Sequence, residues 1–493
     1  YPESAEIHNN LGILYNETKL LDSTVYYFNR AKAYASSSTE HVPIANLIGI
    51  LGKTGFLNEA DSIAKNHSFE SDLPYINNKL AINTRLGIES DKPLTKSFLP
   101  DSILSKIQFA YLNNYTLNTL KNPDTSVLGT IANFSKYSGN QEFSNELKML
   151  EAYKAYYTGD KAWAKSIMDL LRNLSSTPQQ YSKIMGTWML ELRQHELAVE
   201  YFKDFRNLPD IPNKLNLGIA LLKSGNTNEG LEVLNELKEV KEEGSKEIIE
   251  DLLLIFTTHD FNKVMSWEGS LRYQYLHYKK HSLTKDQLST LFQSFSDANL
   301  KTLAGVELMD YYLNLNQPEE ALTYWNIINK QNSAGEQAIR EANYQHLVLL
   351  LQQQNWDELT RVLPEVAIPE ERKFDLNWFK ALTAEAKGDT AAAREYFNEI
   401  LNKNPFAEKA IVSATEFFNK RGQELYAYEK LLEALKLNPV SKELQIAYFL
   451  QSLKLNLTSY AESALQDLKP VLQADEYAKY KQLLDQALND ETL

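Results

Sequence analysis

The second half of the chain alternates apolar residues at helical spacing with short polar breaks. Residues 378–387, WFKALTAEAK, place apolar side chains three or four positions apart, and residues 390–404 do the same. Between these runs Gly388 takes the positive φ that ends a helix, because glycine has no Cβ to clash. Pro405 ends the second run, because proline lacks an N–H and disfavours helical geometry in the preceding residue. The pattern predicts a helix, a tight turn, a second helix and a stop.

This pattern occurs twice in succession. GDTAAAREYFNEILNKNP begins at Gly388 and GQELYAYEKLLEALKLNP begins at Gly422, so that matching residues differ by 34 in number. Each copy carries a small residue early in its second helix, Ala393 or Ala427, followed one turn later by a large apolar residue. A small side chain lets two helices approach closely, and the large one fills the groove beside it. We therefore expect each copy to be a tightly packed helical hairpin.

The spacing resembles the tetratricopeptide repeat, a 34-residue helical hairpin, and weaker copies give about nine recognisable hairpins. The resemblance implies an all-α fold, a right-handed superhelical solenoid of stacked antiparallel hairpins. The phase of the repeat breaks twice, which predicts five segments. These are N-terminal hairpins at 1–68, an irregular helical segment at 69–123, central hairpins at 124–237, a second irregular segment at 238–300 and C-terminal hairpins at 301–493.

Composition narrows the kinds of partner that we expect. The 493 residues are 43% hydrophobic and carry a formal net charge of −14. A surface that binds nucleic acid needs positive charge, so neither nucleic acid nor the RNA-reading pentatricopeptide repeat fits this acidic chain. The chain has no cysteine, which excludes disulfides and thiolate chemistry within it. No run approaches the ~20 apolar residues that a membrane-spanning helix needs.

Candidate catalytic and metal-binding residues are isolated. His277 and His281 lie one helical turn apart, but lysines stand beside them and no third ligand is evident. Ser282 and Lys285 have the SxxK spacing of some acyl enzymes without the partner motifs. Glu89-Ser90 resembles the catalytic pair of some lytic transglycosylases, yet nothing nearby would build a sugar cleft. We expect no enzyme activity, no cofactor and no metal, with an α-helical enzyme using Glu89 or another acid as the least favoured alternative.

An aromatic and basic run, LRYQYLHYKKH, covers residues 271–281. Such a run could stack bases or seat a peptide. Leu271, Tyr275 and Tyr278 share one helical stripe, however, so packing in the core explains the aromatic residues more simply.

The resemblance also implies a binding groove, because the first helices of tetratricopeptide hairpins line an extended concave face. The family's clamp for a terminal carboxylate is not reproduced, since Asn9 and Asn10 fit part of it without the matching lysines. An apolar groove suits an amphipathic helix or an extended hydrophobic segment, although any one of these side chains could instead pack between repeats. The candidate groove residues are Met149, Tyr153, Tyr156, Leu215, Ile219, Leu222, Trp378 and Leu382. Further lining positions are Lys183, Thr187, Leu190, Glu385, Val412, Glu416 and Asn419.

We therefore expect a non-catalytic scaffold that binds protein or peptide partners and helps to assemble a larger complex. The alternative is a regulatory or substrate-presenting arm of a membrane enzyme or secretion machine whose other domain lies upstream of Tyr1. The chain starts without methionine or signal peptide, so any membrane association would come through an upstream anchor or a partner. Abundant Asn, Lys and Tyr without Cys resembles proteins of low-GC bacteria of the Bacteroidota type. That resemblance favours a periplasmic or envelope location over the cytoplasm.

Overall fold

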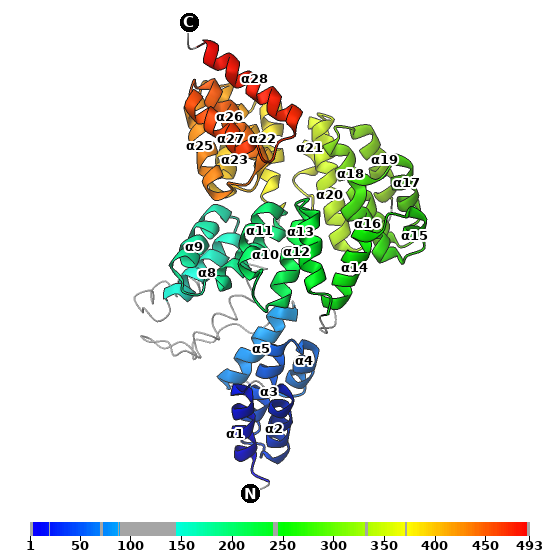
Figure 1. Cartoon of the computed structure of the whole chain (residues 1–493), viewed down its shortest axis with the longest axis vertical. Helices are drawn as coiled ribbons and strands as arrows, with labels where there is room; N and C mark the ends of the chain where they lie inside the picture. The colour runs from blue at the N-terminus through cyan, green and yellow to red at the C-terminus, as the bar shows by residue number, and fades with distance from the viewer. Residues whose placement is uncertain are drawn as a thin grey trace. The chain divides into compact units, whose positions relative to one another are not determined.

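The computed structural model describes residues 3–18, 20–69, 72–86, 88, 144–239, 245–330, 334–369 and 372–490. Within these ranges the chain forms 26 α-helices, two short 3-10 helices and no strand (Figure 1). The helices pack as hairpins, which confirms the predicted all-α solenoid of tetratricopeptide-like hairpins. Glu89-Ser90, most of the irregular segment 69–123 and the start of the central segment lie outside the described residues.

The chain divides into two compact units, unit 1 from Tyr1 to Thr158 and unit 2 from Gly159 to Leu493. The finer division into five segments stays a prediction. Unit 1 contains α1 (Ala5–Glu17), α2 (Leu21–Tyr34), α3 (His41–Thr54), α4 (Leu57–Lys65), α5 (Leu73–Leu86) and α8 (Ser144–Tyr157).

In unit 1, α1 pairs with α2, and α3 packs against α4 and α5. Gly12 of α1 lies against the ring of Phe28 in α2, where a Cβ on the glycine would come within 2.5 Å of the ring. Phe28 is itself buried in a core that α3 fills with Leu47 and Ile48. A small residue against a large one thus sets the spacing of the first hairpin, as the repeat pattern requires.

Unit 2 contains most of the hairpins. Its first helices are α9 (Lys161–Leu174), α10 (Gln179–Glu191), α11 (His195–Phe202), α12 (Ile211–Lys223) and α13 (Thr227–Glu236). They are followed by α14 (Ser245–Thr257), α15 (Phe261–Met265), α16 (Gly269–Lys279), α17 (Lys285–Gln293), α18 (Ala298–Asn314) and α19 (Pro318–Ile328). The remaining helices are α20 (Glu336–Gln352), α21 (Trp356–Val362), α22 (Asp375–Ala386), α23 (Thr390–Lys403), α24 (Glu408–Asn419), α25 (Glu424–Leu437), α26 (Lys442–Lys454), α27 (Thr458–Leu468) and α28 (Ala474–Asp490). The two 3-10 helices are η3 (Lys203–Phe205) and η4 (Lys280–Ser282).

The two hairpins that define the repeat have the geometry expected of them. Gly388 joins α22 to α23 at φ 82°, and Gly422 joins α24 to α25 at φ 70°. Ala393 and Ala427 are buried in one continuous core. The helix α23 ends at Lys403, two residues before Pro405, so the sequence signals for the turn and the stop are both correct.

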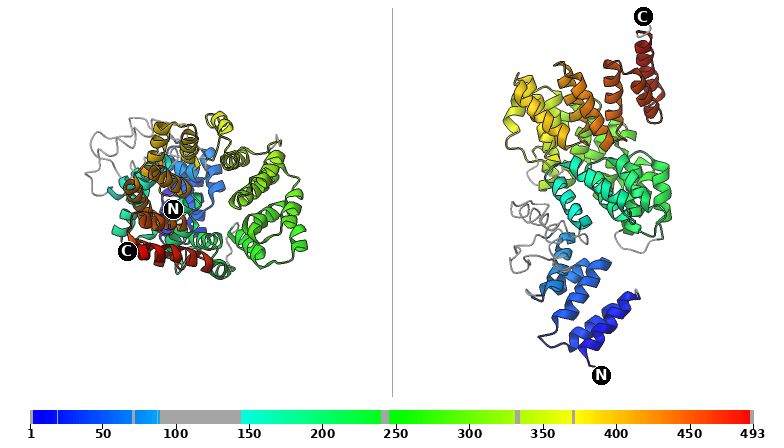
Figure 2. Two further views of the ribbon diagram at one scale, coloured as in Figure 1. Left: turned by 90° about the horizontal axis from the view of Figure 1, so that it is seen from above. Right: turned by 90° about the vertical axis from the view of Figure 1, so that its left-hand side faces the viewer.

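The second irregular segment, 238–300, consists of shorter helices that still stack in sequence. Helix α14 contacts α16, and α16 contacts α18. Figure 2 shows these green helices as part of the same stack as the hairpins around them. Tyr275 is buried in their core, with Leu271 and Tyr278 packed against it, so the aromatic run 271–281 serves mainly as core packing.

Candidate partner-binding cavity

Unit 2 contains a partly open cavity of about 740 Å³. Its walls come from the first helices of successive hairpins, α10, α12, α16, α18, α20, α22 and α24, and from the turns beside them. This is the face that a stack of tetratricopeptide-like hairpins turns inward. The cavity therefore occupies the place where the repeat pattern predicts a binding surface.

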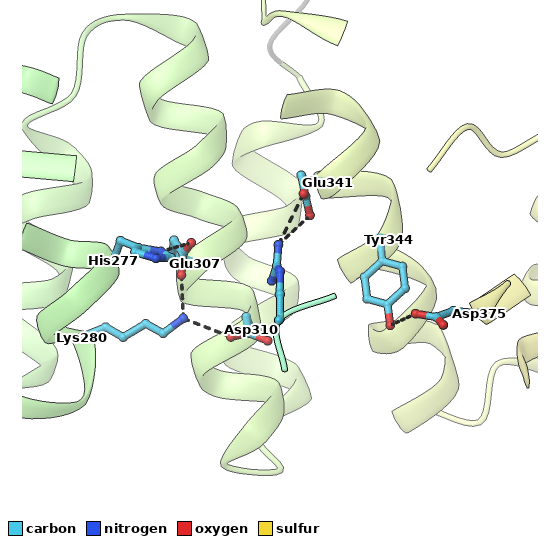
Figure 3. A network of polar contacts seen from close by, with 8 residues as sticks. His277, Lys280, Glu307, Asp310, Glu341, Tyr344 and Asp375 are labelled. Carbon is cyan, nitrogen blue, oxygen red and sulfur yellow. Dashed lines mark hydrogen bonds and ion pairs between the residues drawn. The ribbon is translucent and has the colours of Figure 1, made fainter. Parts of the chain in front are cut away.

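A buried cluster of charges stands on the wall formed by α16, η4 and α18. Glu307 accepts from His277 Nδ1 at 2.7 Å and from Lys280 Nζ at 2.6 Å, and Lys280 also donates to Asp310 at 3.0 Å (Figure 3). Burial alone would raise the pKa of Glu307, but the hydrogen bond from His277 and the charge of Lys280 lower it well below its usual range. Burial likewise opposes the charge of Lys280, and Glu307 and Asp310 outweigh it, so the pKa of Lys280 is raised. Both groups are therefore charged at neutral pH.

A second polar group lies between α20 and α22. The Tyr344 hydroxyl donates to Asp375 at 3.1 Å (Figure 3), and the guanidinium of Arg372 lies 4.0 Å from the centre of the Tyr344 ring. Burial raises the pKa of Tyr344, and the charge of Asp375 adds to the effect. Burial also raises the pKa of Asp375, although Arg372 opposes this shift. The tyrosine is thus held as a neutral donor to the carboxyl group.

Arg193 reaches the cavity from an unusual backbone position. It has φ 59° in the turn between α10 and α11, whereas the corresponding turn after α12 uses Gly225 at φ 85°. A non-glycine residue in this left-handed region costs roughly 1–2 kcal/mol, which other contacts of the residue must offset. An ion pair offsets part of this cost, because the carboxylate of Glu341 in α20 lies 3.3 Å from the Arg193 guanidinium.

Arg193, His195 and Lys223 together form the basic corner of the cavity. Burial, then the charges of Lys223 and Arg193, lower the pKa of His195 to about 4, so its ring is neutral at pH 7. Its Nδ1 is buried and has no hydrogen-bond partner within the described part of the chain. Lys223 makes no ion pair within that part of the chain either. Its Nζ lies 5.9 Å from the centre of the Tyr278 ring. Burial and the charge of Arg193 lower the pKa of Lys223, and the charge of Glu307 opposes this shift.

The side-chain oxygen of Gln352 is a further polar atom without a partner. Gln352 lines the cavity from α20, and its Nε2 donates to the carbonyl oxygen of Leu313 at 2.8 Å. Its Oε1 is buried and accepts no hydrogen bond among the described residues. A buried acceptor without a partner loses the hydrogen bonds it made to water, so it favours an occupant that donates to it.

The structure distributes the predicted groove residues over both units. Leu222 and Trp378 line the cavity, as does the additional position Leu190. Leu215 is buried in the core of unit 2, and Ile219 packs against that core. Leu382 packs against the core of the C-terminal hairpins. Met149, Tyr153 and Tyr156 all belong to α8 of unit 1, where Tyr156 is buried. The cavity thus gathers Leu222 and Trp378 from the eight candidates, and binding by the others stays a prediction.

The charged residues of the cavity were missed by sequence reasoning. Arg193 and Glu341 are 148 residues apart, and no local pattern links them. Two signals were present in the sequence. Arg193 stands where several related turns carry glycine, and Glu307 and Asp310 interrupt the otherwise apolar stretch AGVELMDYYL three residues apart. Acidic side chains on a helix face that should be buried indicate partners across the hairpin.

The two histidines considered as metal ligands have other partners. His277 contacts Glu307, and the ring of His281 lies 5.4 Å from that of Tyr311. No group of three or more His, Asp or Glu side chains is placed to hold a metal ion within the ranges that the structure covers. In those same ranges, no helix combines the length and the apolar character needed to cross a bilayer.

No family model matches the chain, and no curated relative matches it. Solved structures do match, at 13% identity or less for those named here. Yeast Tom70 aligns over 99% of this chain and 96% of its own, with 13% identity and a TM-score of 0.34. One chain in the crystal structure of the APC/C hetero-tetramer Cut9–Hcn1 aligns over 98% of this chain and 96% of its own, with 11% identity and a TM-score of 0.31. The TPR2AB domain of yeast Sti1 aligns over 64% of this chain and 99% of its own, with 12% identity and a TM-score of 0.21. With TM-scores this low, the assignment of a tetratricopeptide-like fold depends on the chain's own hairpins.

Proposed function

We propose that unit 2 is a non-catalytic protein-interaction module whose cavity holds a peptide segment of a partner protein. The cavity volume of about 740 Å³ lies within the ~300–1,000 Å³ typical of ligand pockets. Such a space suits a short segment and excludes a folded domain. Its walls combine aromatic and aliphatic side chains, such as Trp378 and Leu222, with charged ones, which suits a segment of mixed character.

The segment carries an acidic side chain that binds at the basic corner. The observation that carries this proposal is Lys223, an exposed cation on the cavity wall with no ion-pair partner among the described residues. Its ammonium group can therefore pair with an acidic side chain that enters the cavity. Such a carboxylate of the partner would also face Arg193. Because the chain as a whole is acidic, most of its surface would repel an acidic segment, whereas this corner would attract it.

We further propose that this binding helps to assemble a multiprotein complex. Placing that complex in a bacterial cell envelope depends on composition alone, as does the alternative of an arm on a membrane enzyme or secretion machine. Both roles need the same interaction module, so they share the test that follows.

The test uses peptides selected on the full chain from a random phage-display library. Synthetic copies are measured by fluorescence anisotropy, each with its acidic residues and with the matching amides. We expect Lys223→Ala to weaken binding of the acidic peptides by about 1.5–3 kcal/mol, the usual range for a hydrogen bond to a charged group. The amide peptides should lose much less. Lys214→Ala is the matched control, because Lys214 lies on the same helix away from the cavity. Equal binding of acidic and amide peptides to a folded Lys223→Ala variant and to the wild type would reject the proposed corner.

A further inference from the structure

Two stretches of unit 2, α9–α11 and α23–α25, meet beside the cavity, and we call them the two ends of the run of helices that lines it. Helix α9 contacts both α23 and α25, although more than 200 residues of chain separate them. The turn between α10 and α11 and the turn between α23 and α24 both line the cavity. Phe406 and Glu408 both line the cavity, so the contact between these two ends borders it.

Side-chain amides join the two ends. Gln194, the residue before α11, donates from Nε2 to the carbonyl oxygen of Phe406 at 3.3 Å. Its Oε1 accepts from Asn438 Nδ2 at 3.0 Å, and the same nitrogen donates to Glu408 Oε1 at 3.1 Å. Asn438 thus uses both N–H groups to tie Gln194 to the start of α24. Asn438 is fully buried, so no water can replace these partners while the ends are together.

We propose that Gln194, Asn438 and Glu408 form a latch that closes unit 2 over the cavity and opens to admit the bound segment. The closing half of this proposal stands on the hydrogen bonds above, whereas the admission of a segment rests on the function proposed for the cavity. The latch consists of a few polar contacts, each worth about a fivefold change in an equilibrium. Such contacts can break and re-form without unfolding the hairpins on either side.

Glu408 makes the latch sensitive to pH. Burial raises its pKa to about 7, the charges of Glu443 on α26 and Glu196 on α11 add to the shift, and hydrogen bonds from Ser441 and Asn438 oppose it. Its neighbour Lys409 is directed to Asn314 of α18, at 3.4 Å.

The direction of the pH effect follows from this shift. When the ends separate, Glu408 meets water and its pKa returns toward the ordinary carboxyl value, which is below that of the closed form. The closed form therefore holds the proton over a range in which the open form has lost it. Closure is complete at low pH, weakens by up to about tenfold per pH unit as the pH rises toward 7, and changes little above that.

Distances between the two ends test the latch directly. The chain has no cysteine, so Glu200→Cys on α11 and Glu429→Cys on α25 give two unique sites for spin labels on exposed positions. Double electron–electron resonance on the full chain, without any peptide, should show one short distance at pH 5.5. Longer distances should appear as the pH rises to 8. Glu408→Gln, which stays neutral, should keep the short distance at both values.

Removing the amide contacts should have the opposite effect. Gln194→Ala should raise the open fraction at both pH values, by about fivefold for each hydrogen bond lost. Gln317→Ala is the matched control, because Gln317 also precedes a second helix, α19, but is exposed and makes no hydrogen bond to Gln194, Asn438 or Glu408. Asn438→Ala is informative only where circular dichroism shows it folded, and Gln194→Ala provides the test otherwise. An unchanged distance distribution across pH and in folded Gln194→Ala would overturn the latch.

Peptide binding then tests the second half separately. If the latch controls entry, Gln194→Ala should bind the peptides selected on the wild type about fivefold faster, and Gln317→Ala should not. If the distances between the labels respond to pH but no peptide binds, the closing contact is supported and its role in admitting a segment is rejected. Binding at an unchanged rate in the opened variant would also reject that role.

Discussion

Glu307 shows how single residues carry charge inside unit 2. Its carboxylate is only 12% exposed, and His277 and Lys280 both donate to it. Such a cluster tolerates exchange of all its members for apolar residues better than the loss of one, because one loss leaves a buried charge without a partner. The side chains around Glu307 therefore form a set whose members depend on one another.

Replacing Lys280 by methionine tests this dependence, since methionine keeps the aliphatic volume and removes the charge. Glu307 and Asp310 would then face each other without their shared cation. We expect Lys280→Met to lower the free energy of unfolding by about 3–5 kcal/mol in urea denaturation. Lys285→Met is the control, because Lys285 is 71% exposed and its ion pair with Glu320 spans 3.5 Å. That control should stay within about 1 kcal/mol of the wild type. A comparable small effect for both variants would show that the cluster contributes little.

At the scale of helices and hairpins, the sequence contained most of what the structure shows. Gly388, Ala393 and Pro405 determined a turn, a close helix contact and a helix end, each by local physical chemistry. These signals work because a hairpin is stabilised mainly by residues within 34 positions of one another. The cavity depends on contacts such as Arg193 with Glu341, which no local signal encodes. Sequence reasoning therefore predicted the hairpins and three cavity residues, Leu190, Leu222 and Trp378, and missed the charges between them.

Ala393 offers a test of hairpin packing. It is completely buried between α22 and α23, beside the buried ring of Phe397. Ala393→Leu should overpack this contact and lower stability by about 1–3 kcal/mol. Ala391→Leu is the control, since Ala391 lies two residues earlier in the same helix and is exposed. Urea unfolding with hydrogen exchange read by mass spectrometry would locate the effect in α22–α25. Equal stability of the two variants would contradict the assigned packing.

For the whole molecule, the division into two units implies two separate sources of stability. The core around Phe28 contains residues of unit 1, and the cores that include Leu308 and Phe397 contain residues of unit 2. Repeats mainly transmit stability to their neighbours, so a defect at one end of a solenoid has its largest effect locally. Damage to the first hairpin should therefore leave the hairpins of the latch and cavity protected.

Gly12→Ala tests this independence. A Cβ at Gly12 would lie 2.5 Å from the ring of Phe28, and the ring cannot retreat easily because it is buried in the core of unit 1. We expect hydrogen exchange in peptides from α1 and α2 to accelerate at least tenfold, since about 1.4 kcal/mol of local destabilisation changes an opening equilibrium by that factor. Peptides from α22–α25 should exchange as in the wild type. Asn10→Ala is the control, an exposed position on the same helix that should change neither region. Faster exchange of α22–α25 in Gly12→Ala would show that the two units fold as one cooperative body.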